Sequence, residues 1–404
     1  LSIKKRMVYL RKIKNDIFQR REEIARILMA DSARVPFSAE GLIFEILNNF
    51  SIAKKAAAVL QINDLISLHP LIYRTKKCRL TWAPYGVIGV ISAANSPFFE
   101  SFQQILQAVL VGNTVIVKPS EATPKVSRIM EELFRESDIP EGVITFDHGG
   151  GTVGEQLIRA DGISKIVLYG KRETGKRAIA LSAESIKPMV LGLGGSEAAV
   201  VLNDCHIERT VNGIIYGAYC NSGQTCSCIR RVIALRPIAK TLRDRLVKRI
   251  SAIAIRGLDD KENEIGRIQK ESDKEALLDA VAQAQEEGAE IVTGGEVDAG
   301  GKRVSPLLIE NVRPDMKIMQ EEFMGPYICL CIADSIEEAL DIANGTKYGL
   351  TASVWTSDYR YGEEIAGRLQ AGTVWINDSQ FYHYDLPHGG MKESGYGKTG
   401  GHEG

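Results

Sequence analysis

The sequence predicts an α/β protein with two domains, each organised around its own sheet. Its 404 residues exceed what one hydrophobic core usually organises, so two domains of ordinary size are expected. Short β-rich runs also alternate with helix-like stretches from Val87 to Ile376. That alternation is typical of parallel strands joined by crossover helices.

Residues 1–67 are predicted to form two or more helices. Ile13, Ile17, Ile24 and Ile27 are spaced by threes, fours and sevens, with polar residues between them. The basic stretch at the start lacks the apolar core of a signal peptide, and no apolar run is long enough to span a bilayer. We therefore expect a cytoplasmic protein that does not insert into a membrane.

Residues 84–194 contain the first alternation and, with residues 1–67, are predicted to form a Rossmann-like nucleotide-binding domain. The expected strands are Val87–Ser92, Thr114–Lys118, Val143–Phe146, Ile166–Tyr169 and Pro188–Leu193. The expected helices are Phe98–Val111, Lys125–Glu136 and Glu173–Ala183. Open sheets of this kind bind ligands at the carboxyl ends of their strands.

Residues 195–393 contain a second alternation and are predicted to form a second α/β domain. The expected elements include Arg231–Leu235, Lys274–Glu287, Pro306–Ile309, Tyr327–Ile332, Leu350–Trp355 and Gly372–Ile376. Residues 68–83 are predicted to form an extended arm, grouped with the C-terminal end at 394–404. An exposed edge of this kind invites pairing with another subunit.

Composition excludes several classes of protein. The formal net charge is -1, with 44% hydrophobic and 25% charged residues, so the basic excess of a nucleic-acid binder is missing. The seven cysteines are few and scattered, which favours reduced thiols over a disulfide framework. No cysteine pair has the gap typical of structural zinc loops, and no histidines have the spacing of a metal site, so no metal is expected.

Cys226 is the candidate nucleophile. It follows Asn221-Ser222-Gly223-Gln224-Thr225, a Gly-containing turn at the end of the predicted helix Ile207–Tyr219. A turn there can surround the thiol with backbone N–H groups, which stabilise a thiolate and the oxyanion that forms when it attacks a carbonyl. A buried structural cysteine is the competing interpretation, and it is the more common one.

Three polar residues follow predicted strands of the first domain. Asn95 comes after Val87–Ser92 and can donate a hydrogen bond to an oxyanion, although it or Ser96 can equally cap the next helix. Lys118 and Glu121 can together hold a ribose diol, with a solvated loop pair as the alternative. Residues 148–154 match the GxGxxG spacing but lack the acidic partner of a dinucleotide fingerprint, so no site is assigned to them.

Taken together, these stretches resemble the aldehyde dehydrogenase superfamily from about Pro84 to Gly400. The resemblance implies that fold, with a nucleotide-binding domain, a catalytic domain and a small oligomerisation arm. It rests on an ordered set of motifs. They are Asn95 with Pro97, Val117-Lys118-Pro119-Ser120-Glu121, Gly170 to Gly175, Leu193-Gly194-Gly195, Gly223-Gln224-Thr225-Cys226, Glu321-Glu322 before Gly325-Pro326, Gly372-Thr373-Val374-Trp375-Ile376-Asn377, and Gly389-Gly390-Met391-Lys392-Glu393-Ser394-Gly395.

The resemblance implies a role for each candidate residue. Cys226 would attack the aldehyde, Asn95 would help hold the oxyanion, and hydride would pass to the nicotinamide and leave a thioester. The implied cofactor contacts are Lys118 and Glu121 at the adenosine ribose, Gly170 and Lys171 at the pyrophosphate, Glu322 at the nicotinamide ribose, and Ser92 and Leu193 along the cleft. The resemblance also implies a homodimer or homotetramer.

Gly192 departs from the family pattern. Hydrolytic members carry at this position a glutamate that activates the deacylating water. Removing a positioned base costs about a hundred- to ten-thousandfold in rate. Oxidation to the carboxylic acid then requires a substitute such as Glu197 or Glu322. The alternatives are acyl transfer to coenzyme A, whose thiol needs less activation, and a catalytically impaired binding or scaffold protein.

Further departures bear on the cofactor and the substrate. Lys171 stands where the family commonly has a small hydroxyl residue, and its cation could accept the 2′-phosphate of NADP. Glu121 favours NAD because a carboxylate repels that phosphate. Met324 replaces a phenylalanine near the nicotinamide, and Ala94 replaces a larger aromatic residue, which predicts a roomier substrate entrance.

Overall fold

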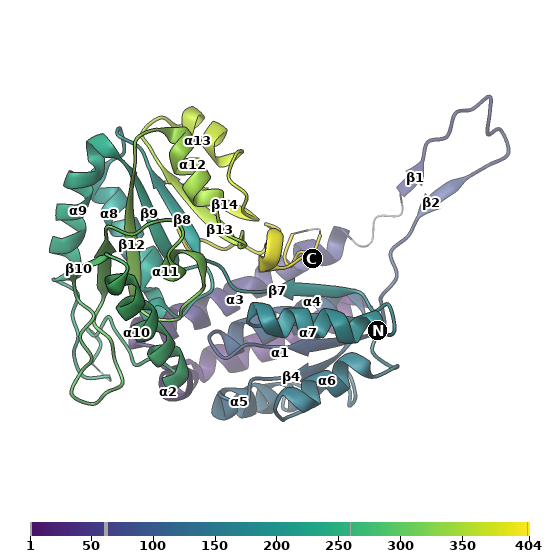
Figure 1. Ribbon diagram of the computed structural model, residues 1–404. Coiled ribbons are helices and arrows are strands. Elements are labelled where there is room, and N and C mark those ends of the chain that lie inside the picture. The colour runs from purple at the N-terminus through teal and green to yellow at the C-terminus, as the bar shows by residue number, and fades with distance from the viewer. Residues whose placement is uncertain (1, 60–63, 259, 402) are drawn as a thin grey trace.

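The computed structural model describes residues 2–59, 64–258, 260–401 and 403–404 (Figure 1). It confirms an α/β fold, and the described residues form a five-stranded sheet, a seven-stranded sheet and a two-stranded hairpin. Residues 60–63 of the predicted N-terminal helical region, and residue 1, lie outside the described residues. None of the helices in the described ranges combines the length and the apolar character that crossing a membrane requires.

The first sheet is wholly parallel and has the order β5-β4-β3-β6-β7. Its strands are β3 (Val87–Ile91), β4 (Thr114–Lys118), β5 (Ile144–Phe146), β6 (Lys165–Tyr169) and β7 (Met189–Gly192). Strands β4 and β5 follow β3 in the chain and lie on one side of it, and β6 and β7 then lie on its other side. The strand order therefore reverses beside β3, which is where open sheets leave a crevice for ligands.

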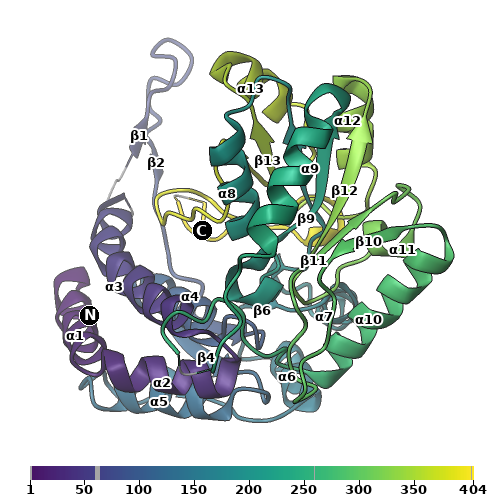
Figure 2. The same ribbon diagram turned by 90° about the vertical axis from the view of Figure 1, so that its left-hand side faces the viewer.

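Helices cover both faces of this sheet (Figure 2). One face packs against α1 (Ile3–Gln19), α2 (Arg21–Ser32), α3 (Pro36–Val59), α4 (Pro97–Val111) and α5 (Pro124–Arg135). The other packs against α6 (Gly151–Arg159) and α7 (Arg172–Ala183). Ile13, Ile17 and Ile24 are fully buried in the first of these cores, as their helical spacing predicted.

The second sheet is mixed and has the order β10-β11-β12-β9-β8-β13-β14. Its strands are β8 (Glu197–Val201), β9 (Ile229–Leu235), β10 (Glu290–Thr293), β11 (Leu307–Glu310), β12 (Tyr327–Ala333), β13 (Thr351–Trp355) and β14 (Thr373–Ile376). Only β10 runs antiparallel, at the edge beside β11. Every residue of the central strands β8, β9 and β13 is buried, which agrees with the apolar residues that predominate in them.

The helices of this half divide between the two faces of the second sheet. They are α8 (Ile207–Tyr219), α9 (Arg236–Ile250), α10 (Glu271–Glu286), α11 (Lys317–Gln320), α12 (Ile336–Asn344) and α13 (Tyr359–Ala366). Helices α8 and α9 pack on one face, and α10, α11, α12 and α13 pack on the other. The end of α8 then delivers the chain toward the first domain.

The predicted arm at 68–83 contains β2 (Cys78–Leu80), which pairs with β1 (Asp64–Ile66) in an antiparallel hairpin. The prediction of helices up to residue 67 was wrong for β1, which is a strand. The hairpin projects away from the body of the molecule (Figure 1). Leu71 and Trp82 beside it are 78% and 61% exposed. Residues 394–396, from the segment grouped with the arm from sequence, instead lie along β7, where the backbone N–H groups of Leu191 and Leu193 donate to the carbonyls of Tyr396 and Ser394. The domain boundaries themselves stay a prediction.

Candidate active site

A strained turn positions Cys226. Helix α8 ends at Tyr219, and the following 3-10 turn Cys220–Gly223 holds three successive residues at positive φ, namely Asn221 at 50°, Ser222 at 58° and Gly223 at 69°. A Cβ at Gly223 would lie 2.0 Å from the carbonyl oxygen of Gly325, so only glycine fits there.

Hydrogen bonds from the second domain hold this turn. The Arg230 guanidinium donates to the carbonyls of Gly223 and Gly325, the latter at 2.7 Å. The Ser222 hydroxyl accepts from the Gly266 N–H at 2.7 Å. The Gln224 side chain donates to the Arg267 carbonyl at 3.1 Å. Because the turn is fixed at several points, the thiol three residues later has a defined position.

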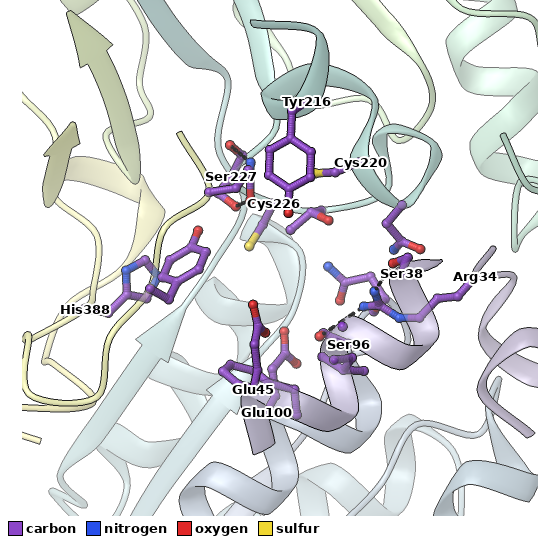
Figure 3. A pocket seen from close by; sticks show the side chains of 18 of the residues that line it. Arg34, Ser38, Glu45, Ser96, Glu100, Tyr216, Cys220, Cys226, Ser227 and His388 are labelled. Carbon is purple, nitrogen blue, oxygen red and sulfur yellow. Dashed lines mark hydrogen bonds between the residues drawn. The ribbon is translucent and has the colours of Figure 1, made fainter. Parts of the chain in front are cut away.

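Cys226 lies where two cavities meet. One has a volume of about 790 Å³ and is lined largely by the second domain, α3 and α4. The other has a volume of about 540 Å³ and lies at the carboxyl ends of β3 and β6. The residues that line both are Asn95, Glu100, Tyr169, Gly192, Leu193 and Cys226. Figure 3 shows the Cys226 sulfur directed into the space between the two domains. We call the first the substrate cavity and the second the cofactor cavity.

The thiol of Cys226 rests in its neutral form. Burial raises its pKa well above the usual value, and the carboxyl groups of Glu100, Glu322 and Glu197 raise it further. Both effects disfavour a thiolate, which is the nucleophilic species. The geometry therefore presents a thiol that must lose its proton before it can attack.

Alkylation of Cys226 by iodoacetamide is expected to be slow at pH 7 and to accelerate about tenfold per pH unit. The sign follows from the raised pKa, because the thiolate fraction keeps growing with pH until that pKa is reached. The rate is measured by mass spectrometry of the Cys226 peptide, with the Cys226→Ala variant as the control for other thiols. A fast rate that is flat between pH 6 and pH 8 would contradict the raised pKa.

Asn95 lies in the loop between β3 and α4, and its place is fixed through its backbone. The Arg34 guanidinium donates to the Asn95 carbonyl at 3.0 Å and to the Ser96 hydroxyl at 3.3 Å. It also donates to the Ser38 hydroxyl at 2.8 Å, which Figure 3 shows beside the Ser96 contact. Ser96 occupies the N-cap of α4 without a side-chain capping bond. The structure therefore has Ser96 at the N-cap and Pro97 at the first position of α4, as the helix-capping alternative predicted, although the cap makes no side-chain hydrogen bond.

The seven residues predicted to contact a cofactor all line the cofactor cavity. They are Ser92, Lys118, Glu121, Gly170, Lys171, Leu193 and Glu322. Within the described ranges, the buried Ser92 hydroxyl oxygen has no hydrogen-bond partner, so it is free to bind a ligand. These features fit a dinucleotide at the reversal of strand order.

Lys118 and Glu121 form a salt bridge at the end of this cavity. The Lys118 ammonium lies 2.8 Å from a Glu121 carboxylate oxygen. The hydrogen bond from Lys118 lowers the pKa of Glu121, so its carboxylate is ionised at neutral pH. The pair thus offers a donor and an acceptor side by side, which is what a ribose diol requires.

Lys171 and Glu322, which lie farther along the cofactor cavity, both have partners within the protein. The Lys171 ammonium lies 2.6 Å from an Asp273 carboxylate oxygen, so its charge is paired across the cavity. Glu322 accepts from the Gly195 N–H at 3.3 Å, and burial raises its pKa to about 7. A Cβ at Gly194 would lie 1.7 Å from a Glu322 oxygen, so that carboxyl fills the space over the glycine.

Gly192 faces an aromatic ring where a side chain would stand. It is the register partner of Tyr169 on the neighbouring strand. A Cβ at Gly192 would lie 2.6 and 2.7 Å from two carbon atoms of the Tyr169 ring. The Tyr169 hydroxyl accepts from the Gln104 side chain at 2.8 Å, which holds the ring in place. The space for a base at position 192 is thus occupied.

Gly192→Ala is expected to lower the free energy of unfolding by about 1–3 kcal/mol, since overpacking a tight side-chain contact costs that much, and the melting temperature should fall with it. Placing the same change in a Tyr169→Ala background removes the clash, so the further loss there is expected to be smaller. Thermal unfolding of the four proteins measures the coupling. An equal loss in both backgrounds would show that the ring does not set the limit.

Glu197, one of the two predicted substitutes for the missing base, lies apart from both cavities. The residue is 2% exposed, and its carboxyl group accepts a hydrogen bond from the Thr351 N–H at 2.6 Å. Burial raises its pKa to about 8. It lines neither the substrate cavity nor the cofactor cavity. Glu322, the other named substitute, lines the cofactor cavity but not the substrate cavity.

Several residues at the site were not predicted. Arg34 comes from the connection between α2 and α3 and Glu100 from α4, and neither belongs to a catalytic motif, although a charged residue within the apolar run Pro97–Val111 is a signal in itself. Gly151 and Gly154 line the cofactor cavity, yet the glycine-rich stretch that contains them was set aside. Asp273 enters from α10, far along the chain, which sequence spacing does not reveal.

Comparisons with known proteins agree with this geometry. A family model described as the aldehyde dehydrogenase family matches residues 1–404. A 2-aminomuconic 6-semialdehyde dehydrogenase from a Pseudomonas species is 31% identical, over 98% of this chain and 82% of that protein. A 2-hydroxymuconic semialdehyde dehydrogenase from Pseudomonas putida is 33% identical, over 79% of this chain and 67% of that protein.

Solved structures superpose closely on the whole chain. An NAD-dependent aldehyde dehydrogenase from Sinorhizobium meliloti has a TM-score of 0.96 at 30% identity and is covered over 80% of its length. The NAD+ complex of an aldehyde dehydrogenase from Bacillus cereus has a TM-score of 0.95 at 32% identity and is covered over 82% of its length. In both comparisons all of this chain is matched.

Proposed function

This chain belongs to the aldehyde dehydrogenase family, and we propose that it oxidises an aldehyde to the carboxylic acid through a thioester on Cys226. The observation that carries the proposal is the position of Cys226 at the junction of the substrate and cofactor cavities. An aldehyde in the first cavity and a hydride acceptor in the second would meet at that sulfur. Asn95 lines the same junction.

The residues at the junction each have a task in this reaction. Cys226 first releases its thiol proton to water in the substrate cavity, and its sulfur then bonds to the aldehyde carbon while the carbonyl π electrons move to the oxygen. The Asn95 amide donates a hydrogen bond to that oxyanion without adding a charge. Arg34 acts as a positioning residue, since its bond to the Asn95 carbonyl fixes the loop. The turn Cys220–Gly223 keeps the thiol in place during attack.

The cofactor cavity fits a nicotinamide dinucleotide, which when bound supplies the acceptor for the hydride. Lys118 and Glu121 would hold the adenosine ribose, and Gly170 would let the pyrophosphate approach the backbone. Glu322 would hold the nicotinamide ribose, and Ser92 and Leu193 would line the cleft. We propose NAD rather than NADP. The ionised Glu121 repels a 2′-phosphate, and the Lys171 charge is paired with Asp273.

Transfer of the acyl group to coenzyme A is the second candidate, and Gly192 favours it. The Tyr169 ring occupies the space of a base at this position, and a thiol acceptor needs less activation than water. A third, a protein that forms one thioester and then stalls, would share the same site. Hydrolysis is preferred because the carboxyl group of Glu100 lines both cavities together with Cys226.

One assay distinguishes these functions. Purified protein is mixed with a panel of short and aromatic aldehydes and either NAD or NADP, with and without coenzyme A, while absorbance of the reduced cofactor is followed. Steady turnover without coenzyme A supports hydrolysis, and turnover that requires it supports acyl transfer. If no mixture produced reduced cofactor, both hydrolysis and acyl transfer would be overturned.

We also infer that the hairpin β1–β2 joins subunits into a homodimer or homotetramer. Its exposed apolar residues Leu71, Ile72 and Trp82 support this inference. Light scattering of the intact chain, compared with a Leu71→Ser/Trp82→Ser double variant, tests it. A wild-type mass equal to one chain would overturn the inference.

A further inference from the structure

Glu100 carries a buried carboxyl group. It lies in the first turn of α4, and the residue is 8% exposed. One of its oxygens accepts from the Ala93 N–H at 3.4 Å. Burying a carboxyl group costs free energy that packing alone does not return, so such a residue is a candidate for function.

The Glu100 carboxyl group faces the nucleophile. Figure 3 shows the side chains of Glu45 and Glu100 next to each other on the side of the pocket that faces the Cys226 sulfur. Among the carboxyl groups of the described residues, Glu100 is the one that lines both the substrate cavity and the cofactor cavity. Of the groups that raise the pKa of Cys226, its charge is the largest after burial, which agrees with their proximity.

The other carboxyl groups near the site are placed differently. Glu322 lines the cofactor cavity alone, and Glu197 lines neither. Glu45 lines the substrate cavity from α3 but does not reach the cofactor cavity. Within the part of the chain that the structure describes, Glu100 is thus the carboxyl group that borders Cys226 from both cavities, so a water that entered the substrate cavity would meet it there.

We propose that Glu100 is the general base of deacylation, in the place that Gly192 leaves without one. This inference rests on the proposed function, because it requires a thioester on Cys226. The Glu100 carboxylate accepts a proton from water as the water oxygen bonds to the thioester carbon. The carbon–sulfur bond then breaks, the acid leaves, and the proton passes from Glu100 to the Cys226 thiolate.

The charges around Glu100 set its pH dependence. Burial raises its pKa to about 8, while the Ala93 N–H and the Arg34 guanidinium act in the opposite direction. Glu45 on α3, Tyr169 at the end of β6 and Cys226 also face the same region. A carboxyl group serves as a base only when ionised, so hydrolysis of the thioester should speed up as pH rises toward 8 and then level off.

Glu100→Gln tests the assignment. Glutamine has the same size and still accepts from the Ala93 N–H, so folding and NAD binding should be retained. After mixing with aldehyde and NAD, we expect one equivalent of NADH per site, followed by steady turnover about a hundred- to ten-thousandfold slower than wild type. Intact-protein mass spectrometry should show the acyl group on Cys226. The rise of the deacylation rate toward pH 8 should disappear.

Two comparison variants sharpen the test. Glu286→Gln makes the same chemical change on the exposed surface of α10 and should match wild type. Glu100→Asp should recover part of the hydrolysis and its pH dependence, which a merely structural role would not predict.

The measurements distinguish failure of the proposed role of Glu100 from failure of the proposed oxidation through Cys226. An unchanged steady rate and pH profile in Glu100→Gln would overturn the role of Glu100 and leave the proposed function intact. Loss of the initial equivalent of NADH in Glu100→Gln would place Glu100 before the thioester and also overturn it. If wild type forms neither NADH nor an acyl adduct with any aldehyde, the proposed function itself fails.

Discussion

Cys226→Ala is expected to reduce the formation of NADH from aldehyde by at least about a thousandfold. Without the sulfur no covalent adduct forms, so the carbon never acquires the electron density that expels hydride. The fold should persist, because the side chain is only partly buried and the turn before it is held by Ser222, Gln224 and Arg230. Stopped-flow absorbance at saturating aldehyde and NAD measures the effect.

A matched control for this variant is Cys205→Ala. Cys205 is also a free cysteine, but it lies after β8 and lines neither cavity. NADH formation in this control should remain close to wild type. Activity that survives in Cys226→Ala would refute the nucleophile, and one would then examine the neighbouring Cys220 and Cys228.

Asn95→Ala is expected to lower kcat by about a hundred- to a thousandfold, the usual effect of removing one oxyanion donor. The loss should appear in the initial burst of NADH, because the oxyanion develops during attack and hydride loss. Aldehyde KM should change much less, since the ground-state carbonyl carries little charge. Rapid-mixing kinetics separate the burst from the steady phase.

Asn203→Ala, in the exposed loop after β8, is the corresponding control for Asn95→Ala and should leave both phases unchanged. A raised KM with an unaltered burst rate would mean that the Asn95 amide only binds the substrate. That result would remove it from the catalytic group while leaving Cys226 in place.

Much of the first domain could be predicted from sequence because its strands are short, apolar and bounded by glycine or proline. The strand Thr114–Lys118 was predicted with the same limits that the structure shows. The edge strand β10 was not predicted. Its residues Glu290 and Ile291 are exposed, so they lack the buried apolar run that identifies the central strands.

The site divides in the same way. Cys226 and Asn95 follow local turns whose residue types already suggest their chemistry, and the structure brings both to one junction. The Tyr169 ring over Gly192 depends on the register of two strands. Glu100 reaches the junction from α4, and Arg34 contacts the Asn95 loop from the connection between α2 and α3, through packing that no local pattern encodes. Long-range neighbours of this kind need coordinates.

The C-terminal segment along β7 limits how the two domains can move. The Leu191 N–H donates to the Tyr396 carbonyl at 2.9 Å, and the Leu193 N–H donates to the Ser394 carbonyl at 3.0 Å. Residues that follow the second sheet are thereby hydrogen-bonded to the edge of the first. A hinge rotation that separated the sheets would break these two hydrogen bonds, so they oppose rigid-body opening of the cleft between the domains.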